Sequence, residues 1–197
     1  SGLEAYHSKY HGSSYNELAR EYFEKAAKKG NADAYYYLGS LDERIYDYAA
    51  ALSHYQEGVE KGSDLARLGL GNLYRNGNGV LTDLEKANDL FDEALDNGCV
   101  EANYYKGIMI KNGLAGEDAD ANKALELLDR VADSENPSFV AAAAEAKGTI
   151  YKNGYAGVEK DIDKALKYYN EAIEAYRNAI RLAGESSTMY YALASAY

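Results

Sequence analysis

Several residue types are scarce in this sequence of 197 residues, which has one Pro, one Cys and no Trp. Because Cys99 is alone, no internal disulfide can form, which is typical of proteins from a reducing compartment. No stretch rich in Gly, Ser and Pro indicates a flexible linker or a low-complexity segment. No apolar run approaches the roughly 18 residues of a membrane span, so we expect no insertion into a membrane.

Motifs for catalysis and for metal or cofactor binding are also missing. The sequence has no phosphate-binding loop, no nucleophile elbow and no zinc spacing. His7 and His11 are four residues apart, but no third ligand is apparent near them. Asp118, Asp120 and Asn122 resemble the start of a calcium loop, but a Lys follows where that loop needs Gly, so we interpret Asp120 as a helix cap. The sequence therefore predicts no metal, no cofactor and no enzymatic activity.

The charge and the aromatic content narrow the class of partner. The formal net charge is −11, so the phosphates of nucleic acid and of anionic membrane surfaces should repel the chain. The simplest interpretation of this acidity is a solvated surface. Among the aromatic residues there are 21 Tyr against 3 Phe. A Tyr has a large apolar body and a polar tip, which suits half-buried surfaces.

What the sequence does contain is an internal repeat made of two alternating segments. The first segment opens with Ala, has a large apolar residue four positions later, and has a small or medium one three positions after that. These spacings place the three positions on one helix face. The copies are Ala19/Phe23/Ala26, Ala51/Tyr55/Gly58, Ala87/Phe91/Ala94, Ala124/Leu128/Val131 and Ala165/Tyr169/Ala172. His54 stands where the other copies have Tyr or Leu, so we interpret it as a packing residue.

In the second segment an Ala precedes a Gly by five residues, as in Ala34/Gly39, Ala66/Gly71, Ala102/Gly107 and Ala143/Gly148. A Gly inside a helix costs about 1 kcal/mol relative to Ala, so its recurrence predicts a close contact between two helices. Other Gly residues follow the segments as expected of helix C-caps, at Gly30, Gly62, Gly77, Gly98, Gly113 and Gly154. Asp residues precede the first segment as N-caps, at Asp47, Asp83, Asp120 and Asp161.

This alternation predicts an all-α fold, a solenoid of about five antiparallel helix pairs in a single domain over residues 1–197. We expect the pairs to span roughly residues 1–30, 31–62, 63–98, 99–135 and 136–183, followed by a partial inner helix over 184–197.

Three longer stretches carry a resemblance to a known family. They read YFEKAAKKGNADAYYYLG at 22–39, LGNLYRNGNGVLTDLEKA at 70–87 and KGTIYKNGYAGVEKDIDKA at 147–165. They are similar to Sel1-like repeats, a family related to tetratricopeptide repeats. The resemblance implies a right-handed superhelix whose Leu-Gly helices line a concave face, and adaptor roles in protein complexes. Three features depart from the family. The loop after Asp42 lacks the Gly-x-Gly-Val element, residues 166–188 carry an insertion, and the cysteines that clamp some bacterial relatives are absent.

The candidate binding residues lie on the helices expected to line that face. Positions two and three before the Gly hold aromatic residues, namely Tyr36, Tyr37, Tyr104, Tyr105 and, in the last unit, Tyr191. Later in these helices a cation and an amide precede a Gly, at Arg75–Asn76, Lys111–Asn112 and Lys152–Asn153. These pairs suit helix ends, because cations complement the dipole there and Asn before Gly favours a stop. They would equally serve as donors to the carbonyls or carboxylates of an extended peptide.

We therefore predict a protein–protein interaction scaffold that binds a protein or extended peptide on its concave face. One alternative is a small-ligand binder or an enzyme that uses the groove, which would need a closed pocket with convergent polar groups. Another is a structural array that self-associates through exposed end helices.

Overall fold

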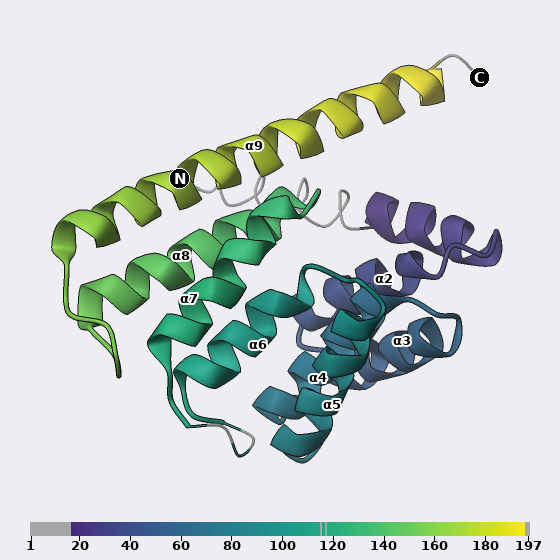
Figure 1. Ribbon diagram of the computed structural model, residues 1–197. Helices are drawn as coiled ribbons and strands as arrows, with labels where there is room; N and C mark the ends of the chain where they lie inside the picture. The colour runs from purple at the N-terminus through teal and green to yellow at the C-terminus, as the bar shows by residue number, and fades with distance from the viewer. Residues whose placement is uncertain (1–16, 115, 117, 196–197) are drawn as a thin grey trace, which may run out of the picture. The chain divides into compact units, whose positions relative to one another are not determined.

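The computed structural model describes residues 17–114, 116 and 118–195, and over this part of the chain it is helical with no strand (Figure 1). The backbone forms one isolated bridge, between Tyr155 and Val158. The described residues up to Cys99 form one compact unit, and those from Val100 onward form a second. The prediction of an all-α helical repeat is confirmed.

The first unit begins with a helix over residues 17–28 and continues with two helix pairs. The first pair joins α2 (Asp33–Arg44) to α3 (Tyr48–Glu60), and the second joins α4 (Asp64–Asn76) to α5 (Leu84–Asp96). Fully buried side chains lie between these helices, among them Tyr55, Leu68, Leu73 and Phe91. The apolar face that each helix presents every three or four residues is therefore buried against its neighbours.

The second unit holds two further pairs. The first of these joins α6 (Ala102–Lys111) to α7 (Ala121–Arg130), which a short 3-10 turn (Val131–Asp133) extends. The second joins α8 (Pro137–Asn153) to α9 (Ile162–Ser195). Its core includes Met109, Leu128, Val131 and Ile150, which are all almost completely buried.

The recurring Gly of α2, α4, α6 and α8 packs as predicted. In the first unit a Cβ atom on Gly39 would overlap the ring of Tyr55, and one on Gly71 would lie 2.5 Å from the Phe91 ring. In the second unit a Cβ on Gly107 would lie 3.1 Å from Cγ of Leu128, and one on Gly148 would lie 2.8 Å from the Tyr169 ring. Each Gly therefore faces the large residue of the helix that follows it, which explains the spacing of both segments.

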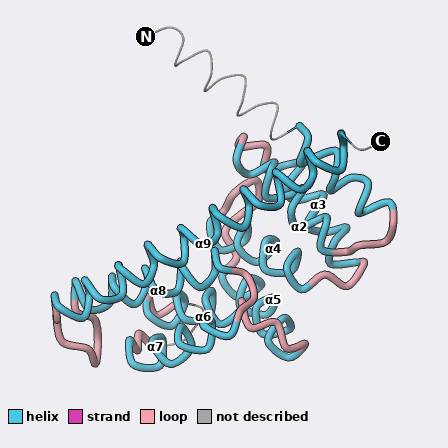
Figure 2. The backbone as a smooth tube through the Cα atoms, turned by 90° about the horizontal axis from the view of Figure 1, so that it is seen from above, coloured by secondary structure: helices cyan, strands magenta, loops and turns pink. Residues whose placement is uncertain are grey.

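The predicted caps are confirmed at the ends of the helices, where Figure 2 shows the loops as short pink segments. The side chains of Asp47, Asp83, Asp120 and Asp161 each accept a hydrogen bond from the backbone N–H three residues later. Gly77 ends α4 in the left-handed conformation with a φ of 71°. The capping interpretation of Asp120 therefore holds, rather than the calcium-loop one.

The structure corrects the prediction for the end of the chain. The helix that begins at Ile162 continues to Ser195, without the expected break between residues 183 and 184. This stretch contains no Pro, and Gly184 stands alone in it. A single Gly weakens a helix by about 1 kcal/mol but does not end it when good helix formers stand on both sides.

Candidate functional site

The tyrosines of α2 lie in an aromatic cluster that includes the preceding and following helices. The Tyr37 ring stacks on Phe23 with centroids 4.9 Å apart, and it meets Tyr36 edge-on at 5.2 Å. Tyr36 in turn lies 6.1 Å from the ring of Tyr55. Tyr37 keeps 37% of its surface exposed. The two rings are thus fixed by packing, and part of Tyr37 is available for contact.

The corresponding tyrosines of α6 form a second cluster. Tyr104 and Tyr105 meet edge-on with ring centroids 5.1 Å apart. Both rings also approach Phe139 of α8, at 6.2 and 6.1 Å. Both side chains are half-buried. Edge-to-face packing of this kind holds the rings in defined orientations.

At the end of α4, Arg75 and Asn76 form a network of side-chain hydrogen bonds on their own helix. Nη2 of Arg75 donates to Oδ1 of Asn72 over 2.7 Å, and Nε donates to Oδ1 of Asn76 over 3.3 Å. Nδ2 of Asn76 also donates to Asn72, over 3.3 Å. The neighbouring amides therefore position the guanidinium at the helix end.

In the second unit the cations of α6 and α8 differ in their surroundings. Nζ of Lys111 lies 5.0 Å from the centre of the Tyr155 ring, a cation–π arrangement. Asn112, Lys152 and Asn153 are exposed. The backbone of α9 includes residue 191, but the side chain of Tyr191 lies outside the described residues. His7 and His11 also lie outside them.

A buried ionic cluster in the first unit was not predicted from the sequence. Asp42 of α2 is 2% exposed, and its two carboxylate oxygens contact Nη2 of Arg20 and Nδ1 of His54, each at 2.6 Å. The interpretation of His54 as a packing residue is therefore incomplete, because its ring also hydrogen-bonds to a buried carboxylate. Next to it, the hydroxyl of Tyr55 donates to Oε1 of Glu43 over 2.5 Å. Burial raises the pKa of Glu43, and this hydrogen bond partly opposes the rise.

Buried lysines form a second unpredicted feature, in α6 and α8. Lys106 and Lys147 each directly precede the recurring Gly, and each is less than a tenth exposed. Nζ of Lys147 donates to Oδ1 of Asp129 over 2.8 Å and lies 4.6 Å from the centre of the Tyr168 ring. Burial raises the pKa of Tyr168. The lysine stem is thus packed in the helix interface while its charge is neutralised at the edge.

A comparison of the repeat copies, position by position, would have indicated both the Asp42 cluster and the buried lysines. Asp42 stands three residues after Gly39, where the later helices have Tyr74, Ile110 and Tyr151. A polar residue in an apolar position needs a partner, and His54 is a second such substitution in the same helix pair. Lys106 and Lys147 likewise replace the Leu that precedes Gly39 and Gly71.

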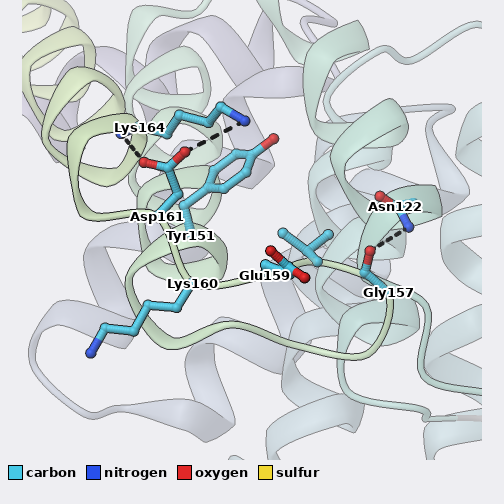
Figure 3. Close-up of a pocket in the computed structure, with 8 residues that line it drawn as sticks. Asn122, Tyr151, Gly157, Glu159, Lys160, Asp161 and Lys164 are labelled. Carbon is cyan, nitrogen blue, oxygen red and sulfur yellow. Dashed lines mark hydrogen bonds and ion pairs between the residues drawn. The ribbon is translucent and has the colours of Figure 1, made fainter.

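A polar pocket of about 290 Å³ opens between the α8–α9 loop and the first turn of α7 (Figure 3). Nδ2 of Asn122 donates to the carbonyl of Gly157 over 2.9 Å, which ties this loop to α7. Nζ of Lys164 lies 3.5 Å from Oδ2 of Asp161 and 5.1 Å from the centre of the Tyr151 ring. The N–H of Lys164 lowers the pKa of Asp161, as expected of a cap. The contacts of Asn122, Asp161 and Lys164 therefore anchor the loop.

In the described part of the chain, no group of three or more His, Cys, Asp and Glu side chains is arranged to hold a metal ion. None of the helices described combines the length and the apolar character that a bilayer crossing requires.

Known proteins were then compared with the chain. A family model described as Sel1 repeat matches residues 14–31, 32–63, 65–99, 100–136 and 142–176. A curated relative is the ERAD-associated E3 ubiquitin-protein ligase component HRD3 of Candida glabrata, which is 34% identical over 80 residues. That match covers 41% of this chain but only 10% of the relative.

Solved structures show the same fold. A Sel1 repeat protein from Oxalobacter formigenes matches with a TM-score of 0.61 and 27% identity, over 78% of this chain and 61% of that one. The protective antigen c5321 of uropathogenic Escherichia coli, described as having an SLR fold, matches with a TM-score of 0.56 and 25% identity, over 84% of this chain and 36% of that one. A Sel1 repeat protein from Klebsiella pneumoniae shares the fold at 23% identity with a TM-score of 0.56, and the match covers 83% of each chain.

Proteins with such repeats generally act as protein-interaction scaffolds. The family matches lie within residues 14–176, and α2 to α9 supply the alternating helices that this repeat requires. The chain therefore belongs to the Sel1 repeat family.

Proposed function

We propose that this chain is a scaffold in which α2 and α4 of the first unit, and α6 and α8 of the second, each bind an extended segment of a partner protein. The observation that carries this proposal is the pair of half-buried tyrosines at the same place in α2 and in α6. In each unit the pair is held by neighbouring aromatic rings, with Phe23 beside Tyr37 and Phe139 beside Tyr104 and Tyr105. Rings that are already fixed lose little conformational entropy on binding, so they are good contact residues.

The cations at the ends of the inner helices supply the chemical selectivity in this proposal. Arg75 closes α4 in the first unit, and Lys111 and Lys152 close α6 and α8 in the second. Hydrogen bonds from such groups to carboxylates are stronger than neutral ones. In a chain with a net charge of −11, these positions are where an acidic peptide segment would be tolerated. The preferred partner is thus an extended segment that carries both aromatic or apolar residues and Asp or Glu.

The family and the curated relative support a partner-binding role. HRD3 is described as a component of a ubiquitin-protein ligase, which is a statement about that protein. The open pocket beside Asn122 gives little support to catalysis or small-ligand binding, because Asp161 and Lys164 in its wall are paired with each other and Asn122 is bonded to the loop. A scaffold is therefore the function that the geometry supports best.

Binding of displayed peptides to the whole chain tests the proposal. A library of random 12-residue peptides is selected against the wild-type protein, and the Kd of the best-binding peptide is measured by fluorescence anisotropy. We expect enrichment of acidic and aromatic residues, and a Kd that rises about tenfold or more, equal to about 1.4 kcal/mol, in the Lys111→Ala/Lys152→Ala variant. The rise should shrink at high salt, since the lost contacts are electrostatic.

The matched control removes two lysines from the outer helices of the same unit, as Lys123→Ala/Lys167→Ala. This variant changes the net charge equally, so its Kd should stay near the wild-type value. If Lys111 and Lys152 act only as helix caps, the peptide Kd does not change and stability falls by a few tenths of a kcal/mol. That result would remove these residues from the binding surface.

A further inference from the structure

The helix α9 carries an apolar stripe that no described part of the chain covers. Ile162 is 48% exposed, Leu166 56%, Ile173 47% and Ile180 73%. Among the described side chains of the second unit, the other large apolar ones of comparable exposure are Tyr176 and Leu182, which also lie on α9. The exposed apolar surface of the unit is thus concentrated on one helix, which marks an interaction surface.

The stripe borders the face that packs on α8, and Tyr169 and Tyr176 lie at the shared edge. The contact with α8 is made through Ala165 and Ala172, which are 2% and 4% exposed, and through Tyr169, whose ring lies against Gly148. The hydroxyl of Tyr176 donates to Glu145 of α8 over 3.1 Å. Leu166 and Ile173 directly follow the buried Ala165 and Ala172, and Ile180 comes four residues after Tyr176. These three residues therefore lie on α9 beside the α8 contact rather than in it.

The spacing of the stripe is that of a coiled coil. Leu166, Ile173 and Ile180 are seven residues apart and correspond to the a positions of a heptad. Ile162, Tyr169 and Tyr176 are also seven apart and occupy the d positions. An a/d pattern of this kind is what a helix needs in order to pack lengthwise against another helix.

We propose that the α9 stripe is a self-association surface on which α9 of a second copy packs in the antiparallel direction. In one register each a residue meets a d residue of the second copy. Ile162 then lies opposite Ile180, Leu166 opposite Tyr176, and Tyr169 opposite Ile173. The two-fold axis passes close to residue 171, so the same contacts form twice and the interface is closed.

The residues that flank the stripe support this register. Asp163, Asn170 and Arg177 are again seven apart and occupy the e positions. In the antiparallel register Asp163 of one copy lies beside Arg177 of the other, and Asn170 lies beside its own equivalent. Arg177 forms an exposed ion pair with Glu174 of its own helix, at 2.7 Å, which is easily exchanged. A parallel dimer would place these residues beside Ala165, Ala172 and Ala179, where no charge is complemented.

The first unit suggests a different occupant for the α9 stripe, namely a further helix pair of the same repeat type. There the equivalent residues of α3 are Tyr48, Leu52 and Val59, and they are partly buried in a cluster that includes Ala66, Leu70 and Leu73 of α4. A helix pair of the same repeat type could therefore cover α9 in the same way. The α9 stripe differs in two respects, because it extends to Ile180, beyond the length of α3, and because it carries the opposite charges Asp163 and Arg177.

Variants that reverse the charge of Asp163 or of Arg177 test the proposal. The dissociation constant of the dimer is measured by sedimentation equilibrium on the whole chain. We expect a wild-type dimer and a dissociation constant at least about tenfold higher in Asp163→Arg and in Arg177→Asp. Each single change places like charges together in the dimer. The double variant should recover most of the loss, because the ion pair is restored in reverse. Circular dichroism confirms that each variant stays helical, as expected for exposed positions.

Cross-linking tests the register independently in a Cys99→Ser background. Asn170→Cys should form an intermolecular disulfide on oxidation, because the two cysteines meet at the axis. Asn178→Cys is the matched control, since it starts from the same exposed residue type but points away from the stripe, and it should stay reduced. A wild-type chain that remains monomeric at about 0.1 mM would overturn the proposal. So would a dimer that the two single charge variants leave unchanged, because the surface would then belong to another occupant.

Discussion

The ring of Tyr55 occupies the space that a Cβ atom on Gly39 would need. The contact joins α2 to α3 within one helix pair, and the same relationship recurs between Gly71 and Phe91 and between Gly148 and Tyr169. Shape rather than backbone conformation accounts for these glycines, since none of them has a positive φ.

Replacing this glycine should therefore destabilise the protein although Ala favours helices. Helix propensity alone would make Gly39→Ala more stable by about 1 kcal/mol. We expect instead a net loss of about 1–3 kcal/mol in the free energy of unfolding, because the Tyr55 ring must move from a packed position. Urea denaturation measures the change. In a Tyr55→Leu background the loss should largely disappear, and a more stable single variant would contradict the contact.

Asp42 should be a strong determinant of stability in the first unit. Its carboxylate neutralises Arg20 and contacts His54 while it is almost completely buried. Removing one partner of a buried ion pair commonly costs about 3–5 kcal/mol, so Asp42→Ala should fall in that range or unfold the unit. Asp89→Ala, at an exposed position of α5, should change stability by less than about 0.5 kcal/mol. Equal effects of the two changes would show that the cluster contributes nothing.

The Lys147–Asp129 pair should respond asymmetrically to substitution. Lys147 is buried whereas the side chain of Asp129 is 64% exposed. Asp129→Ala leaves a buried ammonium without its carboxylate and should destabilise the protein. Lys147→Leu leaves only a solvated carboxylate and restores the residue found at Leu38 and Leu70, so it should be neutral or stabilising. Thermal unfolding of both variants measures the difference, and the opposite order would refute this explanation.

Glu43 should make stability depend on pH in a defined direction. Burial raises its pKa in the folded protein above the ordinary value of 4.5. The folded state therefore binds the proton more tightly than the unfolded state. The resulting stabilisation is complete below pH 4.5 and is lost as the pH rises through the folded pKa. In the Glu43→Gln variant the free energy of unfolding should not fall in this pH range. The Gln side chain still accepts the Tyr55 hydrogen bond but cannot ionise. If the free energy of unfolding varied with pH in the same way in the wild type and in the variant, the pKa of Glu43 would not be raised.

The repeat spacing predicted the local features of the fold, because they depend on residues close in sequence. The Ala, large and small positions predicted the outer helices, and the caps at Asp83, Asp120 and Asp161 were confirmed. The contact of Arg20 with Asp42 was not predicted, because it joins residues 22 positions apart that break the repeat pattern. The length of α9 was predicted wrongly, because the repeat pattern was expected to resume in a separate helix over 184–197.

The candidate site was predicted only as a set of positions. The sequence indicated tyrosines before the glycine and cations near the helix ends, but their neighbours come from other helices. Phe139 lies beside Tyr104 and Tyr105 only because α8 packs on α6. Partner binding by these residues remains a prediction.

The position of Tyr55 has a consequence for how the first unit opens. Its ring fills the space beside Gly39 of α2 and also lies where a Cβ on Gly69 of α4 would be, at 2.5 Å. Neither helix can separate from α3 without exposing the same ring to water. The amide protons of α2, α3 and α4 should therefore exchange with solvent in a single cooperative event, whereas the end of α9 should exchange through independent fraying.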